Sequence, residues 1–188
     1  MHGCLMLFTK KLPSKNDIEN LMGKYNDSAV YGEDGETVKG GMPQFTWDYY
    51  EIGGRYSGSI KLKFEHEDPY YCWDYYEREP RNGRLFWAYI ISQFEENKPR
   101  FFHEESCFGN MGAADGAIYV DGARISDILN YDDLDCYTFM TEDGEAYARS
   151  WYDGNRIADN NDFEEKLKAA KQAAKENNQF VTIIDYHD

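Results

Sequence analysis

The segment around which the chain is organised reads Trp47-Asp48-Tyr49-Tyr50-Glu51-Ile52-Gly53-Gly54-Arg55-Tyr56-Ser57-Gly58. Two consecutive glycines can both take positive φ, as a two-residue type I′ turn requires. The segment therefore predicts a β-hairpin centred on Gly53-Gly54, in which Trp47 lies opposite Ile60. In this register one face of the hairpin is apolar and the other is wet. The apolar face consists of Phe45, Trp47, Ile60 and Leu62.

Arg55 is the candidate functional residue of this segment. Its planar guanidinium can bind a carboxylate or a phosphate through two parallel hydrogen bonds, and neighbouring glycines let a ligand approach the backbone closely. The alternative is a structural ion pair from Arg55 to Asp48 or Glu51. No dinucleotide-binding or P-loop motif accompanies the glycines. The candidate ligand-binding set is Asp48, Glu51, Gly53, Gly54 and Arg55.

Two other segments have helical patterns. Ser14 is an N-cap candidate, with Asp17 three positions later, for a short helix that ends at Gly23. Asn161 is the predicted cap of a second helix over residues 162–177. The acids of that helix lie in its first turn and its lysines follow, as the helix dipole favours. Its apolar face consists of Phe163, Leu167, Ala170 and Ala174.

Apolar runs predict strands over residues 3–9, 117–120 and 179–186, with a turn at Asp121-Gly122. Asp143-Gly144 lies between two further strand patterns, at 136–140 and 146–151, and predicts a second hairpin. The apolar run at 85–94 fits a core strand or a buried helix equally well, and residues 26–43 are predicted to form a long loop.

Together these elements predict an α+β fold, with a largely antiparallel sheet and two to three helices packed on one face. The length of 188 residues and a hydrophobic content of 41% favour one domain over 1–188. An irregular insertion, rich in acids and aromatics, is predicted at 65–110.

Charge is unevenly distributed. The net charge is −15, and residues 65–79 alone carry six acids against one arginine. Such a chain repels nucleic acid, so direct nucleic-acid binding is not expected. It attracts a basic partner and speeds encounter with it. The alternative explanation for the charge is solubility, which acids also supply.

The four cysteines form no C-x-x-C pair, and neither a secretory signal nor a transmembrane segment is recognisable. We therefore expect reduced thiols in a cytoplasmic protein without membrane contact. His103 with Cys107, His66 beside acids, and His187 with Asp185 on one strand face are weak candidates for a metal site, because no known spacing accompanies them. Cys107 with His103 and Cys72 with His66 are weak candidates for a nucleophile pair. No metal, cofactor or catalytic residue is predicted.

The pattern W-D-x-x-x-I-G-G-R-[YW]-x-G at 47–58 resembles a block in an uncharacterised protein family of bacteria and their phages. Asp143-Gly144-Glu145 and the ending at 181–187 are similar to other features of that family. The resemblance implies a phage or mobile-element setting. It brings no known activity and no catalytic residues.

Two functions are therefore expected as alternatives. The first is a non-catalytic acidic protein that imitates nucleic-acid charge and inhibits a basic, nucleic-acid-binding defence protein of the host, as an anti-CRISPR or anti-restriction protein does. The second is a small-molecule or nucleotide-phosphate binder, or an enzyme, centred on Arg55. The first predicts partner-binding residues in two rows: Glu65, Glu67, Asp68, Tyr70, Tyr71, Trp73, Asp74, Tyr75, Glu77 and Glu79, then Asp132, Asp133 and Asp135.

Overall fold

The computed structural model describes the chain in seven pieces, and a few residues at their ends are described by backbone alone. The pieces are residues 2–27, 45–56, 58–65, 76–77, 86–88, 117–152 and 157–187. Within these pieces, no helix has the length and apolar character needed to cross a membrane.

Two strands from opposite ends of the chain form the centre of the sheet. β1 (His2–Thr9) pairs antiparallel with β11 (Phe180–His187) over eight residues, from His2 opposite His187 to Thr9 opposite Phe180. Nearly all residues of both strands are buried. Both apolar runs were predicted as strands, and their continuity is explained by this central position, where both faces of the sheet are covered.

The other strands extend this centre on both sides, in the order β4-β5-β6-β11-β1-β7-β8. β2 also pairs with β11, and β3 with β6. Among the described pairs only β1 with β7 is parallel, so the predicted α+β class and largely antiparallel sheet are confirmed. The bounds are β2 (Tyr49–Ile52), β3 (Ile60–Glu65), β4 (Tyr76–Glu77), β5 (Phe86–Ala88), β6 (Ala117–Arg124), β7 (Thr138–Met140) and β8 (Ala146–Ala148), with a separate pair β9 (Ser150–Tyr152) and β10 (Ile157–Asp159).

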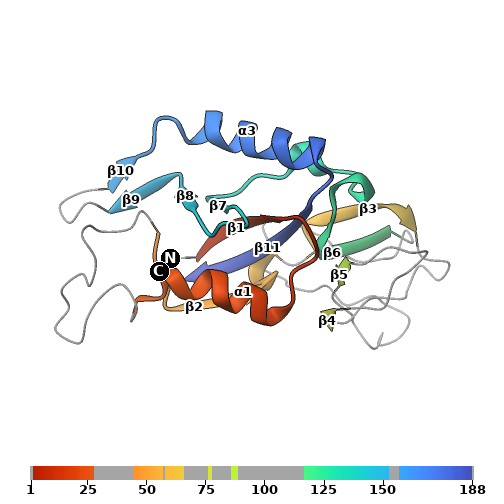
Figure 1. Ribbon diagram of the computed structural model, residues 1–188, viewed down its shortest axis with the longest axis horizontal. Coiled ribbons are helices and arrows are strands. Elements are labelled where there is room, and N and C mark those ends of the chain that lie inside the picture. The colour runs from red at the N-terminus through yellow and green to blue at the C-terminus, as the bar shows by residue number, and fades with distance from the viewer. Residues whose placement is uncertain are drawn as a thin grey trace, which may run out of the picture.

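The two α-helices of the described residues lie on opposite faces of the sheet (Figure 1). α1 (Lys15–Met22) packs Ile18 and Met22 against Leu5 and Leu7 of β1. α3 (Phe163–Glu176) packs against the alternate residues of the same strand, Cys4, Met6 and Phe8. Because successive strand residues point to opposite faces, a fully apolar β1 requires a cover on each side. The prediction that the helices share one face was therefore wrong.

The predicted N-cap of α1 is confirmed, whereas the predicted N-cap of α3 is wrong. The Ser14 hydroxyl accepts the Asp17 N–H, and the Asp17 carboxylate accepts the Ser14 N–H, as the predicted cap requires. Gly23 ends α1. α3 begins one residue later than predicted, and its cap residue Asp162 makes no side-chain capping bond, so Asn161 is not its cap. Short 3₁₀ turns follow at Gly23–Tyr25, Gly54–Tyr56, Ile125–Asp127 and Tyr131–Asp133.

The first predicted hairpin does not form. Ile52 of β2 lies opposite Ile184 of β11, and Ile60 of β3 lies opposite Val120 of β6. The residues assigned to one apolar face are divided between both: Phe45, with half-buried Trp47, packs on the α1 side, whereas Ile60 and Leu62 pack on the α3 side. Asp121-Gly122 is not a turn, because both residues lie inside β6.

The second predicted hairpin is confirmed. Thr138 of β7 lies opposite Ala148 of β8, and Gly144 in the connecting turn has φ of 79°. Of the segment 85–94, Phe86–Ala88 is a strand. The loop at 26–43 and the insertion at 65–110 lie, apart from a few residues, outside the described chain.

Candidate functional site

The Gly53-Gly54 segment crosses two buried carboxylates. Asp121 of β6 is 0% exposed and Asp185 of β11 is 4% exposed. Asp121 accepts the Gly58 N–H at 2.7 Å, and Asp185 accepts the Arg55 N–H at 2.9 Å. A Cβ on Gly53 would lie 2.6 Å from the Asp121 carboxylate, so the glycines are needed for this close approach.

Arg55 is exposed, and its guanidinium makes no hydrogen bond or ion pair with any described residue. Both proposed internal partners are otherwise engaged. Asp48 is 2.9 Å from Nδ1 of His187, and Glu51 lies 3.5 Å from the Tyr49 hydroxyl. The predicted ion pair of Arg55 with Asp48 or Glu51 was therefore wrong. A ligand role for Arg55 stays a prediction.

Two histidine–carboxylate pairs lie beside this loop. Nδ1 of His2 is 2.9 Å from Asp185, and Nδ1 of His187 is 2.9 Å from Asp48. The two imidazole rings meet edge to face, with centroids 5.0 Å apart. Hydrogen bonding and charge interaction with His187 lower the pKa of Asp48. Sequence reasoning placed His187 and Asp185 on one strand face but missed His2 and Asp48, because their positions depend on the pairing of β11 with its neighbours.

The second predicted row, Asp132, Asp133 and Asp135, is exposed, and two of its three carboxylates pair with neighbouring bases. Lys175 pairs with Asp132 at 2.9 Å, and this hydrogen bond lowers the Asp132 pKa. Arg149 lies between Asp135 and Glu164, at 2.9 and 2.8 Å. The Asp133 carboxylate makes no hydrogen bond or ion pair with a described residue.

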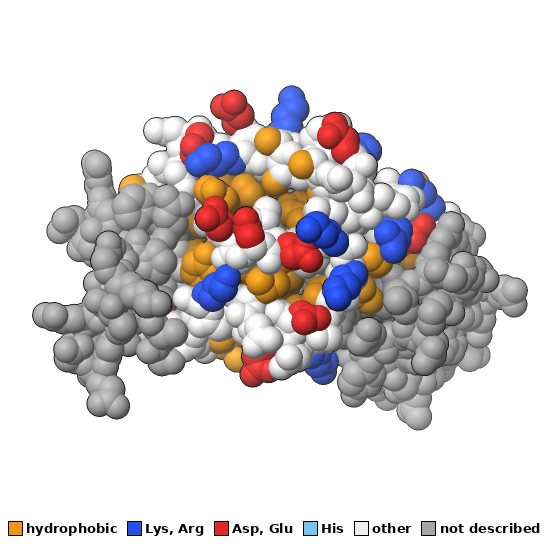
Figure 2. Space-filling model, viewed as in Figure 1, with side chains coloured by type: hydrophobic (Ala, Val, Ile, Leu, Met, Phe, Trp, Pro, Cys, Tyr) orange, Lys and Arg blue, Asp and Glu red, His pale blue; other side chains and the backbone are white. Residues whose placement is uncertain are grey.

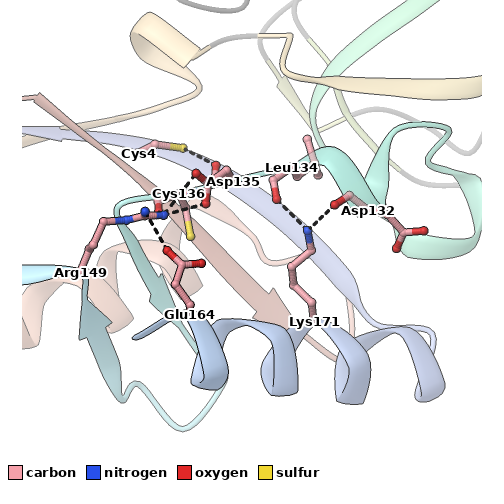
Figure 3. Close-up of polar contacts among 8 residues, drawn as sticks. All are labelled: Cys4, Asp132, Leu134, Asp135, Cys136, Arg149, Glu164 and Lys171. Carbon is pink, nitrogen blue, oxygen red and sulfur yellow. Dashed lines mark hydrogen bonds and ion pairs between the residues drawn. The ribbon is translucent and has the colours of Figure 1, made fainter. Parts of the chain in front are cut away.

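Lys171 holds the same segment to α3. Its ammonium donates to the backbone carbonyls of Asp132 and Leu134 at 3.0 and 2.7 Å, as Figure 3 shows. It also lies over the Tyr131 ring. Burial lowers the Lys171 pKa, although nearby acids oppose the shift. Lys175, Arg149 and Lys171 bind carboxylates and carbonyls of the same segment. Few unpaired carboxylates of this row are therefore left for an external partner.

An open hollow of about 410 Å³ separates this segment from α3. Its acids and lysines are interspersed, and the face seen in Figure 2 likewise mixes both signs of charge. The lining of the hollow holds four acids and two lysines, so it is less acidic than the row of aspartates alone. The lining residues are Asp132, Asp133, Leu134, Asp135, Glu164, Leu167, Lys168, Lys171 and Gln172.

The first predicted row is not placed by the structure. Glu65 and Glu77 belong to strands β3 and β4, and only their backbones are described. The other members, Glu67, Asp68, Tyr70, Tyr71, Trp73, Asp74, Tyr75 and Glu79, lie outside the described residues. Their partner-binding role stays a prediction.

Cys4 and Cys136 are buried thiols on the α3 side of the sheet, and neither forms a disulfide. Burial raises the pKa of Cys136 far above its usual range, which makes it a poor nucleophile. Across the described parts of the chain, no three His, Cys, Asp or Glu side chains gather in a group that could hold a metal ion. His66, His103, Cys72 and Cys107 lie outside the described residues.

Comparison of the chain with protein-family models, with curated proteins and with solved structures found no match.

Proposed function

We propose that this chain is a non-catalytic acidic interaction protein, which binds a basic, nucleic-acid-binding protein of a bacterial host and inhibits it by imitating nucleic-acid charge. The observation that carries the proposal is the concentration of six acids among the fifteen residues 65–79, in a chain of net charge −15. Aromatics alternate with these acids, and they suit stacking on arginine side chains of a partner. An inhibitor of a host defence system, such as an anti-CRISPR or anti-restriction protein, has this chemistry.

The contacts of the described residues divide the predicted surface unequally. Asp132 and Asp135 are paired with Lys175 and Arg149, so forming a new interface there would first break existing ion pairs. Only Asp133 of that row has no such partner within the described chain. We therefore assign most of the binding to the 65–79 block and little to the second row.

The test is a pull-down from host lysate at low and at moderate salt, with three proteins. The first is the unchanged chain, and the second carries Asp74→Lys, Glu77→Lys and Glu79→Lys. The third is a matched control with Glu19→Lys, Asp159→Lys and Glu165→Lys, which are exposed acids outside this block in the sequence. Both variants undergo the same change in net charge, so a difference between them reports the position of the charge.

We expect the unchanged chain and the control to recover a basic nucleic-acid-binding protein, and the 74/77/79 variant to lose it. Recovery should also fall as salt rises, because charge steering is screened. Equal recovery by all three proteins would contradict the proposal.

A second candidate function rests on Arg55. Its guanidinium is exposed and unpaired within the described chain, and its backbone is fixed by Asp185. We propose it as the anchor of an anionic ligand such as a nucleotide phosphate. A thermal-shift screen with phosphates and nucleotides tests this, with Arg55→Lys as the variant and Arg124→Lys as the control. Binding that survives Arg55→Lys would argue against bidentate recognition.

A further inference from the structure

We infer that His2 and His187 form a binding site for a divalent transition-metal ion of the kind that prefers imidazole ligands, with Zn²⁺ as the representative. The two residues lie directly opposite each other on β1 and β11, and their ring centroids are 5.0 Å apart. They are partly accessible, since 28% of the His2 side chain and 42% of the His187 side chain are exposed. The site is independent of the proposed partner binding.

The hydrogen bonds of both rings leave the same nitrogen available. A carboxylate only accepts hydrogen bonds, so Nδ1 of His2 donates to Asp185 and Nδ1 of His187 donates to Asp48. In each neutral ring, Nε2 is then unprotonated and carries a free lone pair. No described residue bonds to either Nε2.

This arrangement matches the outer shell of metal-binding histidines. Such histidines generally donate their other ring N–H to a carboxylate or a carbonyl, which fixes the tautomer, orients the ring and raises its basicity. Here both histidines have a carboxylate in that position, and one of the two, Asp185, is buried and also fixed by the Arg55 N–H. A structural role for either histidine alone would not require two such pairs side by side.

The charge around the rings also favours a cation. Asp48 bonds to His187, Asp185 lies two residues before His187 on β11, and Glu51 lies opposite Asp185 on β2. Arg55, whose N–H bonds to Asp185, is the nearby opposing charge. Two protein ligands leave coordination positions for water. A tetrahedral ion such as Zn²⁺ would complete its shell in that way, as in open metal sites.

The experiment is a titration of the full chain with Zn²⁺, followed by calorimetry and by nitrogen chemical shifts of the histidine rings. We expect binding of one Zn²⁺, with the signals of His2 and His187 moving and their metal-free rings carrying the proton on Nδ1. Binding should weaken as the pH falls, because a protonated imidazole cannot ligate.

Substitutions of single histidines test whether Zn²⁺ binds at His2 and His187 or elsewhere on the chain. His2→Gln and His187→Gln should each abolish the binding, whereas His103→Gln, the control, should leave it unchanged. Asp48→Asn keeps both ligands and alters only an exposed carboxylate, and should weaken binding about tenfold to a hundredfold. A chain extended ahead of Met1 should bind equally well, which removes any contribution of a terminal amine.

Three results would overturn the inference: no Zn²⁺ binding by the unchanged chain, binding unaffected by His187→Gln, or neutral metal-free rings that carry their proton on Nε2. If His2→Gln or His187→Gln reduces folding, the ring tautomers of the unchanged chain and the Zn²⁺ affinity of Asp48→Asn still test the inference.

Discussion

Two segments of this chain carry the same local signal, a glycine-containing turn between strand patterns, and only one of them is a hairpin. At Asp143-Gly144 the flanking strands β7 and β8 pair with each other. The Asp143 carboxylate accepts the Glu145 N–H at 3.1 Å and the Thr141 hydroxyl, both within the turn. The hydrogen bonds to the Asp143 carboxylate and the pairing of the two strands are therefore local in sequence, while Lys24 and Tyr25 donate from outside to the carbonyls of Asp143 and Gly144 at 3.0 and 2.7 Å.

At Gly53-Gly54 the flanking strands separate and pair elsewhere. Both glycines do take positive φ, 73° and 51°, as the sequence predicted. The groups that hold the segment, however, are Asp121 and Asp185, which come from distant strands. The glycine pair therefore predicts the backbone conformation of the segment, whereas the partners of β2 and β3 are decided by contacts far away in sequence.

The largest expected effect comes from adding one methyl group to each segment. Gly54→Ala should lower the free energy of unfolding by about 3–4 kcal/mol, because positive φ is strained and the new Cβ would overlap Asp185. Gly144→Ala, the matched change, should cost about 1–2 kcal/mol, because the group it meets is the flexible end of Lys24. Chemical denaturation measures both. Equal losses would mean that the buried carboxylate does not distinguish the segments.

The carboxylates themselves give the next comparison. Asp121→Ala leaves the buried Gly58 N–H without its acceptor, and should lower stability by about 2–3 kcal/mol. Asp143→Ala should cost well under about 1 kcal/mol, because water replaces the lost acceptor at an exposed turn. Asp121→Asn retains an oxygen that can accept the Gly58 N–H, so it should recover part of the loss. A loss as large for Asp143→Ala as for Asp121→Ala would contradict the distinction.

The same distinction explains which parts of the fold could be predicted from the sequence. The cap of α1, the second hairpin and the apolar strands β1 and β11 depend on residues a few positions apart, and each was identified. Three predictions were wrong, and each depends on which distant strands pair. They are the shared face of Trp47 and Ile60, the turn at Asp121-Gly122 and the placement of α1 and α3 on one face.

The candidate sites divide in the same way. Arg55 was singled out from its local setting, and its exposure agrees with a binding role, but the Asp185 carboxylate that accepts its backbone N–H could not be foreseen. His2 and His187 are nearly the whole chain apart, and only the β1–β11 register brings them together. The neutralisation of Asp132 and Asp135 was likewise invisible, because their bases come from α3 and from Arg149 after β8.

The smallest expected effect is an acid dependence confined to the second turn. Hydrogen bonds from the Thr141 hydroxyl and the Glu145 N–H lower the pKa of Asp143. A carboxyl whose folded pKa is depressed stabilises the fold above its unfolded pKa, near 3.9, and loses this contribution as pH falls through the folded pKa. Asp143→Asn should therefore be less stable than the unchanged chain at neutral pH, and the difference should shrink as the solution is acidified below about pH 4.

The measurement is urea denaturation of both proteins across this pH range, so that effects of all other acids cancel in the difference. Thr141→Val removes the main donor to Asp143 and should show the same pH-dependent difference. Combining Thr141→Val with Asp143→Asn should then add little, because both remove one interaction. A constant difference at every pH would show that the Asp143 carboxylate does not stabilise the turn through its charge. The second hairpin would then depend on its strand pairing and on the contacts from Lys24 and Tyr25. Its turn would no longer differ from Gly53-Gly54 in being stabilised by residues close in sequence.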